Sequence, residues 1–159
     1  MITARGVRMA AVSFRSARSD EGAAMARVFG AARAEMRYLP ALHTPAEDVA
    51  FFSQQVLPTS GMTVAVADGI VGFSAVDDSW LAHLYVAPEW QGNGIGSELL
   101  GRAMAENPAG LSLWAFAENR RAIALYGRAG FEQVLRTDGS RNEERRPDVQ
   151  LRWDGREPA

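Results

Sequence analysis

The stretch that decides the fold is "LYVAPEWQGNGIGSELLGRAM", which runs from Leu84 to Met104. It opens as an apolar, strand-like run and closes as a helix-like run, with Gly92, Gly94 and Gly96 between the two. The first turn of a helix carries a partial positive charge and several N–H groups without an internal partner. Glycines before such a turn let a phosphate approach the backbone closely. The stretch therefore predicts an anion-binding loop at a strand-to-helix junction.

Three kinds of loop can be compared with these glycines. A P-loop ends in Gly-Lys-Ser/Thr, and no such ending follows Gly96. A dinucleotide-binding fingerprint needs a third glycine three residues after Gly96, where Leu99 stands. The spacing that fits is Gln-x-x-Gly-x-Gly, from Gln91 to Gly96. On the glycines alone, a tight turn that binds no ligand is the remaining alternative.

The rest of the chain alternates between strand-like and helix-like segments. Asp68-Gly69 is a strong hairpin signal, Thr44 and Glu47 form a capping box at a helix start, and Gly130 is expected to end a helix. Strands are expected within residues 10–18, 62–78 (a hairpin), 79–88, 110–117, 131–136 and 148–153, and helices within residues 19–40, 43–58, 93–108 and 118–130. This order predicts an α+β fold, in which a mixed, mostly antiparallel sheet of about seven strands is flanked by about four helices.

The composition is that of an ordinary globular protein. The 159 residues are 47% apolar and 23% charged, which is enough for one domain over residues 1–159. Residues 1–8 show no clear pattern and are expected to be a disordered extension. A formal net charge of −2 offers no basic face to nucleic acid, and no apolar run reaches the ~20 residues of a membrane span. Without a signal peptide, the cytoplasm is the expected compartment.

The chain has no cysteine, which restricts its chemistry. A disulfide framework, a thiolate nucleophile and a zinc–thiolate site are all excluded. The two histidines, His43 and His83, are isolated from one another in the sequence, so we expect no catalytic metal.

Two separated stretches resemble the GNAT superfamily of acyl-CoA-dependent N-acetyltransferases. The first is "LYVAPEWQGNGIGSELL", which is similar to the family's pyrophosphate loop and the strand before it. The second is "LWAFAENRRAIALYGRAGFEQV", which matches the family's spacing at Asn119, Ala122, Tyr126 and Gly130-Phe131. The resemblance covers nearly the whole chain and is densest from Leu84 to Val134. It implies that the fourth and fifth strands splay apart.

The resemblance implies a set of donor-binding residues for acetyl-CoA as cosubstrate. The backbone of the fourth strand would bind the pantetheine arm, and the glycine loop would bind the pyrophosphate. Ser97 could add a hydroxyl at the helix start, and Asn119 would contact the pantetheine while also serving as a helix N-cap. Arg121, with Arg120 beside it, is expected near the 3′-phosphate or adenine. The expected donor residues are Leu84, Tyr85, Val86, Gln91, Gly92, Asn93, Gly94, Ile95, Gly96, Ser97, Asn119 and Arg121.

For catalysis, the resemblance assigns Tyr126 to protonating the departing thiolate of coenzyme A. It lies seven residues, or two helical turns, after Asn119 and so shares its face. Relatives often place a base on the fourth strand, but the positions that would face the acceptor here are Trp80 and Ala82. Simple alternation puts His83 on the opposite face, unless a bulge re-aims it. Water is the alternative route for the proton.

The acceptor side is expected to involve the segment between the first two helices. His43 has an ordinary pKa near ~6.5 and could accept a proton at neutral pH, or could be a surface histidine. Glu35 and Tyr38, together with Trp80, are the expected acceptor-binding residues.

The resemblance therefore implies an N-acetyltransferase that moves an acetyl group to a primary amine of a small molecule or peptide, and the lack of cysteine favours direct attack. A non-catalytic acyl-CoA-binding regulatory module is the alternative, because the strand carries no base. A nucleotide-binding α/β domain is a second alternative. Relatives are often dimers, so a homodimer is one expectation.

Overall fold

The computed structural model describes residues 11–155, so the extension expected at residues 1–8 lies outside the described part of the chain. Within these residues, seven strands form one sheet in the order β1-β2-β3-β4-β5-β7-β6, in which only β4 and β5 run parallel. The strands are β1 (Ser13–Ser16), β2 (Gly61–Ala67), β3 (Gly69–Asp77), β4 (Trp80–Val86), β5 (Leu111–Phe116), β6 (Glu132–Thr137) and β7 (Asp148–Trp153). The predicted mixed, mostly antiparallel sheet is confirmed.

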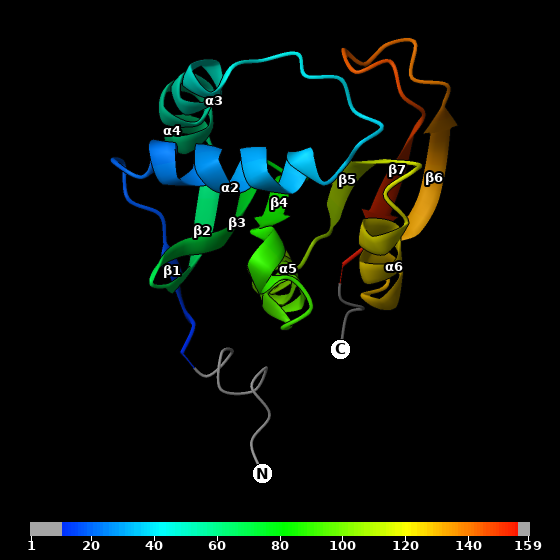
Figure 1. The fold of residues 1–159 in the computed structure, drawn as a ribbon. Helices are drawn as coiled ribbons and strands as arrows, with labels where there is room; N and C mark the ends of the chain where they lie inside the picture. Colours follow the sequence, from blue (N-terminus) through cyan, green and yellow to red (C-terminus); the bar gives the residue numbers. More distant parts are fainter. Residues whose placement is uncertain (1–10, 156–159) are drawn as a thin grey trace.

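The helices lie on both sides of the sheet (Figure 1). They are α2 (Gly22–Ala34), α3 (Pro45–Phe51), which continues through the π-helical η1 (Phe52–Val56) into α4 (Leu57–Thr59), then α5 (Ile95–Glu106) and α6 (Arg120–Arg128). A short 3₁₀ turn, η2 (Pro88–Trp90), precedes the glycine loop. Among the described residues, none of these helices is both long and apolar enough to cross a membrane.

Alternating strand residues divide the core between the two layers of helices. Val64 and Phe73 join the cluster of α2 and η1, which contains Met25 and Phe52. The neighbouring Ala65 joins α5 instead, against Ile95 and Leu99. Val71 lies on this side too, although it is two residues before Phe73, because a bulge in β3 leaves it without a partner in β2. A third cluster joins α5 and α6 to β5 and β7. The period of two along β2 and this bulge in β3 therefore send side chains to opposite sides of the sheet.

Several local signals act as the sequence predicts. The amide of Glu47 donates to Thr44 Oγ1 at 3.2 Å, and the amide of Thr44 donates to Glu47 Oε1 at 3.0 Å, which completes the capping box. Gly69 at the hairpin and Gly130 after α6 have positive φ of 91° and 104°. The first helix is shorter than expected, because it ends at Ala34 and residues 36–39 turn instead.

A bulge in β4 changes which side chains share a face. Ala75 pairs with His83 and Val76 pairs with Leu81, so Ala82 has no partner in β3. Leu81 packs in the α5–α6 cluster, whereas His83 lies edge-on to Phe52 on the α3 side. An extra residue resets the alternation along a strand. His83 therefore lies on the same face as Trp80, and simple alternation, which placed the two on opposite faces, was wrong.

The two central strands, β4 and β5, separate soon after they meet. Trp80 and Ser112 are the one Cα pair recorded between them within residues 11–155. Beyond that pair, β4 is held by β3 alone, so one backbone edge of Leu84, Tyr85 and Val86 faces a gap. The splayed strands that the resemblance implied are present, and they position the site.

Candidate active site

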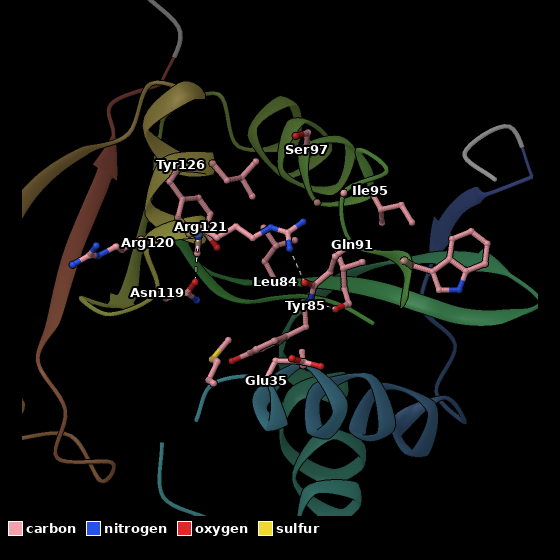
Figure 2. A pocket seen from close by; sticks show the side chains of 18 of the residues that line it. Glu35, Leu84, Tyr85, Gln91, Ile95, Ser97, Asn119, Arg120, Arg121 and Tyr126 are labelled. Carbon is pink, nitrogen blue, oxygen red and sulfur yellow. Dashed lines mark hydrogen bonds between the residues drawn. The ribbon is translucent and has the colours of Figure 1, made fainter. Parts of the chain in front are cut away.

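A cavity of about 630 Å³ opens at the gap between β4 and β5 (Figure 2). Four segments line it: the C-terminal end of α2, the end of β4, the glycine loop with the start of α5, and α6. The volume lies in the range of ordinary ligand sites. The cavity brings together most of the residues expected to bind the donor, which are Leu84, Tyr85, Val86, Gln91, Gly92, Gly94, Ile95, Gly96, Ser97, Asn119 and Arg121.

The glycine loop lies at the start of α5, as the sequence predicts. Gly92 and Gly94 have positive φ of 77° and 85°, and Gly94 is the N-cap of α5. Only glycine adopts such angles at little cost. Gly96 lies within the first turn, and a Cβ built on it would meet Leu125 Cδ2 at 3.6 Å and Val86 Cγ2 at 3.9 Å. Gly96 therefore keeps a narrow passage open between α5, α6 and β4.

Two loop residues have roles that the sequence did not distinguish. The Asn93 amide donates to the carbonyls of Trp90 and Gln91 at 2.9 and 3.2 Å, so this side chain shapes the loop and does not line the cavity. Ile95 anchors α5, because its side chain is buried against the sheet. Any contribution of either residue to a ligand would come from its backbone.

Arg121 bridges the cavity from α6 to the glycine loop. Its Nη1 donates to Gln91 Oε1 at 2.9 Å, and Gln91 Nε2 donates to the carbonyl of Val86 at 3.0 Å. Figure 2 shows Arg121 pointing toward Gln91 and the neighbouring Arg120 pointing the other way. The guanidinium of Arg121 thus lies beside the loop in which an anion would bind.

Tyr126 lies on the inner side of α6 and lines the same cavity. It is 7% exposed, and its ring packs against Phe131 at a centroid distance of 5.7 Å. Burial is the main cause that raises the pKa of Tyr126 above its ordinary value. The phenol therefore stays protonated across the neutral range, as a proton donor must.

Asn119 begins the helix that carries Tyr126. Its Oδ1 accepts a hydrogen bond from the amide of Ala122 at 3.2 Å, so the predicted N-cap is confirmed. The residue also lines the cavity. The neighbouring Glu118 lines it too, although sequence reasoning did not select it, and pairs with Arg146 from the loop between β6 and β7.

Two of the three residues expected on the acceptor side lie at the α2 end of the cavity. Glu35 and Tyr38 line it, and Met36 between them was not foreseen. The hydroxyl of Tyr38 is buried and has no hydrogen-bond partner within the described residues. Trp80, the third, lies outside the cavity wall and is 37% exposed.

His43 does not join Tyr126 in this cavity. It is exposed in the segment between α2 and α3, with Nε2 2.8 Å from Glu143 Oε1 and Nδ1 3.8 Å from Glu47 Oε2. Glu143 belongs to the loop of residues 138–147 between β6 and β7, which Arg33 also holds through Glu144 at 3.1 Å. The placement of His43 favours a role in holding this loop over the end of α2.

The pKa values of the two histidines should lie on opposite sides of the ordinary value for histidine. The hydrogen bond with Glu143 raises the pKa of His43, whereas burial lowers the pKa of His83 to about 4. Because the folded pKa of His43 is raised, its pairing stabilises the fold below the unfolded value of ~6.5 and is lost as the pH rises through the folded value. An NMR titration of the two imidazoles measures both values. Glu143→Gln should return His43 toward ~6.5 and leave His83 unchanged, and an unmoved His43 would contradict the pairing.

Comparisons with known proteins identify relatives of this arrangement. The sequence model of the acetyltransferase (GNAT) domain matches residues 58–133. An uncharacterised N-acetyltransferase of Methanocaldococcus jannaschii is 32% identical over 78 residues, which amount to 40% of this chain and 34% of that protein. The chain thus spans about a third of that relative's length.

Solved structures share the fold over most of the chain. The apo form of YjaB from Escherichia coli has a TM-score of 0.72 and 24% identity, covering 91% of this chain and 99% of that one. The yncA protein of Salmonella typhimurium, solved with its cofactor acetyl-CoA, has a TM-score of 0.72 and 19% identity, covering 93% and 96%. At these identities, the likeness concerns the fold.

Proposed function

The chain contains an acetyltransferase domain of the GNAT superfamily, and on this premise we propose that it transfers an acetyl group from acetyl-CoA to a primary amine by direct attack. One observation carries the proposal: the glycine loop, the free edge of β4 and Tyr126 line a single cavity. A thioester cosubstrate that carries a pyrophosphate can use three groups together, namely an anion-binding loop, a backbone edge without a strand partner and a protonated phenol.

Acetyl-CoA fits the residues present. The N–H groups at the start of α5 would hold the pyrophosphate, since Gly92 and Gly94, which both have positive φ, line the cavity there. Arg121 would add a positive charge beside them. The edge of β4 from Leu84 to Val86 that faces the gap would hydrogen-bond the amide groups of the pantetheine arm, beside the Val86 carbonyl that already accepts from Gln91. Acetyl-CoA itself supplies the activated acyl group.

Three proton transfers are needed. Tyr126 donates a proton to the departing sulfur, because burial keeps its phenol protonated, and regains one from the acceptor nitrogen as the amide forms. Before the attack, the acceptor ammonium must lose a proton, and neither Trp80 nor Ala82 can accept it. His83 is neutral at pH 7, since burial lowers its pKa to about 4, and is a weak base for the same reason. We propose that water carries this proton to solvent. With no cysteine in the chain, direct transfer is favoured over an acyl-enzyme.

The test is amine-dependent release of the coenzyme A thiol. Acetyl-CoA is mixed with the protein and a panel of primary amines, and both free thiol and acetylated amine are measured. We expect both products to appear in equal amounts, above the rate without amine. Tight binding of coenzyme A without acetylation of any amine would instead support the regulatory module. A thermal shift with ATP or NAD but none with coenzyme A would support a nucleotide-binding domain.

A further inference from the structure

Glu35 is a carboxylate that lines the cavity without a cation beside it. It directly follows α2, is exposed, and forms no ion pair with any residue between 11 and 155. Two other carboxylates of this region are neutralised, because Glu118 pairs with Arg146 and Glu144 pairs with Arg33. These two arginines are therefore engaged elsewhere, and Glu35 presents an uncompensated negative charge to the cavity.

The other arginines that could neutralise Glu35 lie on different walls. Arg37, two residues further along the chain, lines a separate cavity of about 340 Å³ between α2 and the residues that follow it. Arg120, Arg121 and Arg128 line the cavity that Glu35 lines, but all three belong to α6. They suit the phosphates of coenzyme A, which a carboxylate repels. Glu35 is therefore better matched to a cation of the acceptor than to any part of the donor.

The position of Glu35 on its helix also favours a cationic ligand. The residue is the C-cap of α2, at the negative end of the helix macrodipole. A carboxylate there is unfavourable for stability, whereas a basic residue such as Arg33 in the last turn is favourable. A cation held at Glu35 would interact favourably with both the carboxylate and the helix end. This argument is independent of the missing ion pair and leads to the same kind of ligand.

Apolar side chains separate Glu35 from Tyr126. Figure 2 shows the two residues on different elements, with Leu84 of β4 between them in this view. Ala32 and Met36, close to Glu35 in the sequence, line the cavity together with Leu84. A nitrogen held by Glu35 is therefore distinct from the nitrogen that attacks beside Tyr126. A hydrocarbon chain that joins the two nitrogens would lie along these apolar side chains.

We propose that the acceptor carries a second, cationic nitrogen joined to its primary amine by an alkyl spacer, and that Glu35 binds this second nitrogen. The inference rests on the proposed function and names the substrate class for the same site. Glu35 acts on binding and specificity, and the acetyl group is transferred to the primary amine at the other end of the spacer.

The first test varies the charge at the far end of the acceptor. Primary amines with chains of about three to six carbon atoms end in a dimethylammonium group, which cannot be acetylated, in a hydroxyl or in a carboxylate, and kcat/KM is measured for each. We expect the dimethylammonium amines to be preferred over the amino alcohols by about fivefold through KM, as an exposed ion pair allows, and the amino acids to be poorest. Glu35→Gln should bring the first ratio close to one, and Glu35→Lys should place the amino acids ahead of the dimethylammonium amines.

The matched control is Glu106→Gln, which removes the same charge from the last residue of α5, outside both cavities. Glu35→Gln and Glu106→Gln both take a carboxylate from the C-terminal end of a helix, so both should raise the melting temperature slightly. Only Glu35→Gln should change the preference among the amines. Amino alcohols used as well as the dimethylammonium amines at every chain length, or a preference that survives Glu35→Gln, overturn the proposal.

A second measurement does not depend on turnover. Saturation-transfer NMR follows the binding of a dimethylammonium amine to the protein with coenzyme A, which cannot donate an acetyl group. The signal should appear in the wild type and in Glu106→Gln, fall in Glu35→Gln, and weaken as sodium chloride screens the ion pair. If no amine is acetylated but this response is seen, the proposed function fails and the cation site stands. If amines are acetylated without the response, the cation site fails alone.

Discussion

Tyr126→Phe should lower kcat by about 10²–10³, within the range that a positioned general acid contributes. The substitution removes only the hydroxyl, since the ring that packs on Phe131 is kept. The departing thiolate then lacks its proton donor, while the glycine loop and β4, which lie on other elements, still bind the donor. The acetyl-CoA dissociation constant should therefore stay within about twofold of the wild-type value.

Steady-state kinetics with one accepted amine, and calorimetry with coenzyme A, measure the two quantities. Tyr38→Phe is a useful comparison, because it removes another cavity-lining phenol, at the α2 end, and should act mainly on the KM of the acceptor. An unchanged kcat in Tyr126→Phe would exclude the phenol from the reaction. A parallel loss of coenzyme A affinity would instead assign Tyr126 to binding.

The pH dependence of the activity provides a second test of the role of Tyr126. Because burial raises the pKa of Tyr126, the phenol stays protonated throughout the neutral range. The activity should therefore show no loss between pH 7 and 9 that depends on this hydroxyl. Any rise in rate over that interval should follow the free-amine fraction of the acceptor, and Tyr126→Phe should keep the same profile at a lower level.

The fold could be predicted because its signals are local. Thr44 and Glu47 cap a helix, and the Asp68-Gly69 turn joins two strands, through contacts among neighbouring residues. The glycine loop was predictable for the same reason, since positive φ at Gly92 and Gly94 is a property of the residue type.

The site could be predicted only where its residues belong to such local patterns. The bulge at Ala82 depends on how β3 and β4 pair, and nothing in "WLAHLYV" marks it, so the sequence could offer it only as an alternative to simple alternation at His83. His43 is held by Glu143, 100 residues away, and spacing carries no information on that contact. Glu118 lines the cavity because the chain turns there between β5 and α6, although glutamate before a helix is ordinary. Long-range pairing decides the first two.

Gly96→Val should raise the acetyl-CoA dissociation constant about 10- to 100-fold, or about 1.4–2.8 kcal/mol. Leu125 and Val86, the two side chains that a Cβ at this position would meet, both line the cavity, so the added carbons would fill the passage between α5 and β4. The substitution should not strain the backbone, because Gly96 is not among the glycines with positive φ. Valine is also a better helix former than glycine. The loss should therefore appear in binding and leave the melting temperature nearly unchanged.

The choice of Gly96 over Gly94 separates obstruction from backbone strain. Gly94 has a φ of 85° with nothing within 4 Å of a built Cβ, so alanine there would strain the loop without filling space, by about 1–2 kcal/mol. Gly101→Val is the matched control, because it changes the same residue type on the same helix where a Cβ meets nothing within 4 Å. Calorimetric titration of coenzyme A into the three proteins distinguishes the causes. Equal affinity in Gly96→Val and Gly101→Val would mean that the donor does not pass between α5 and β4.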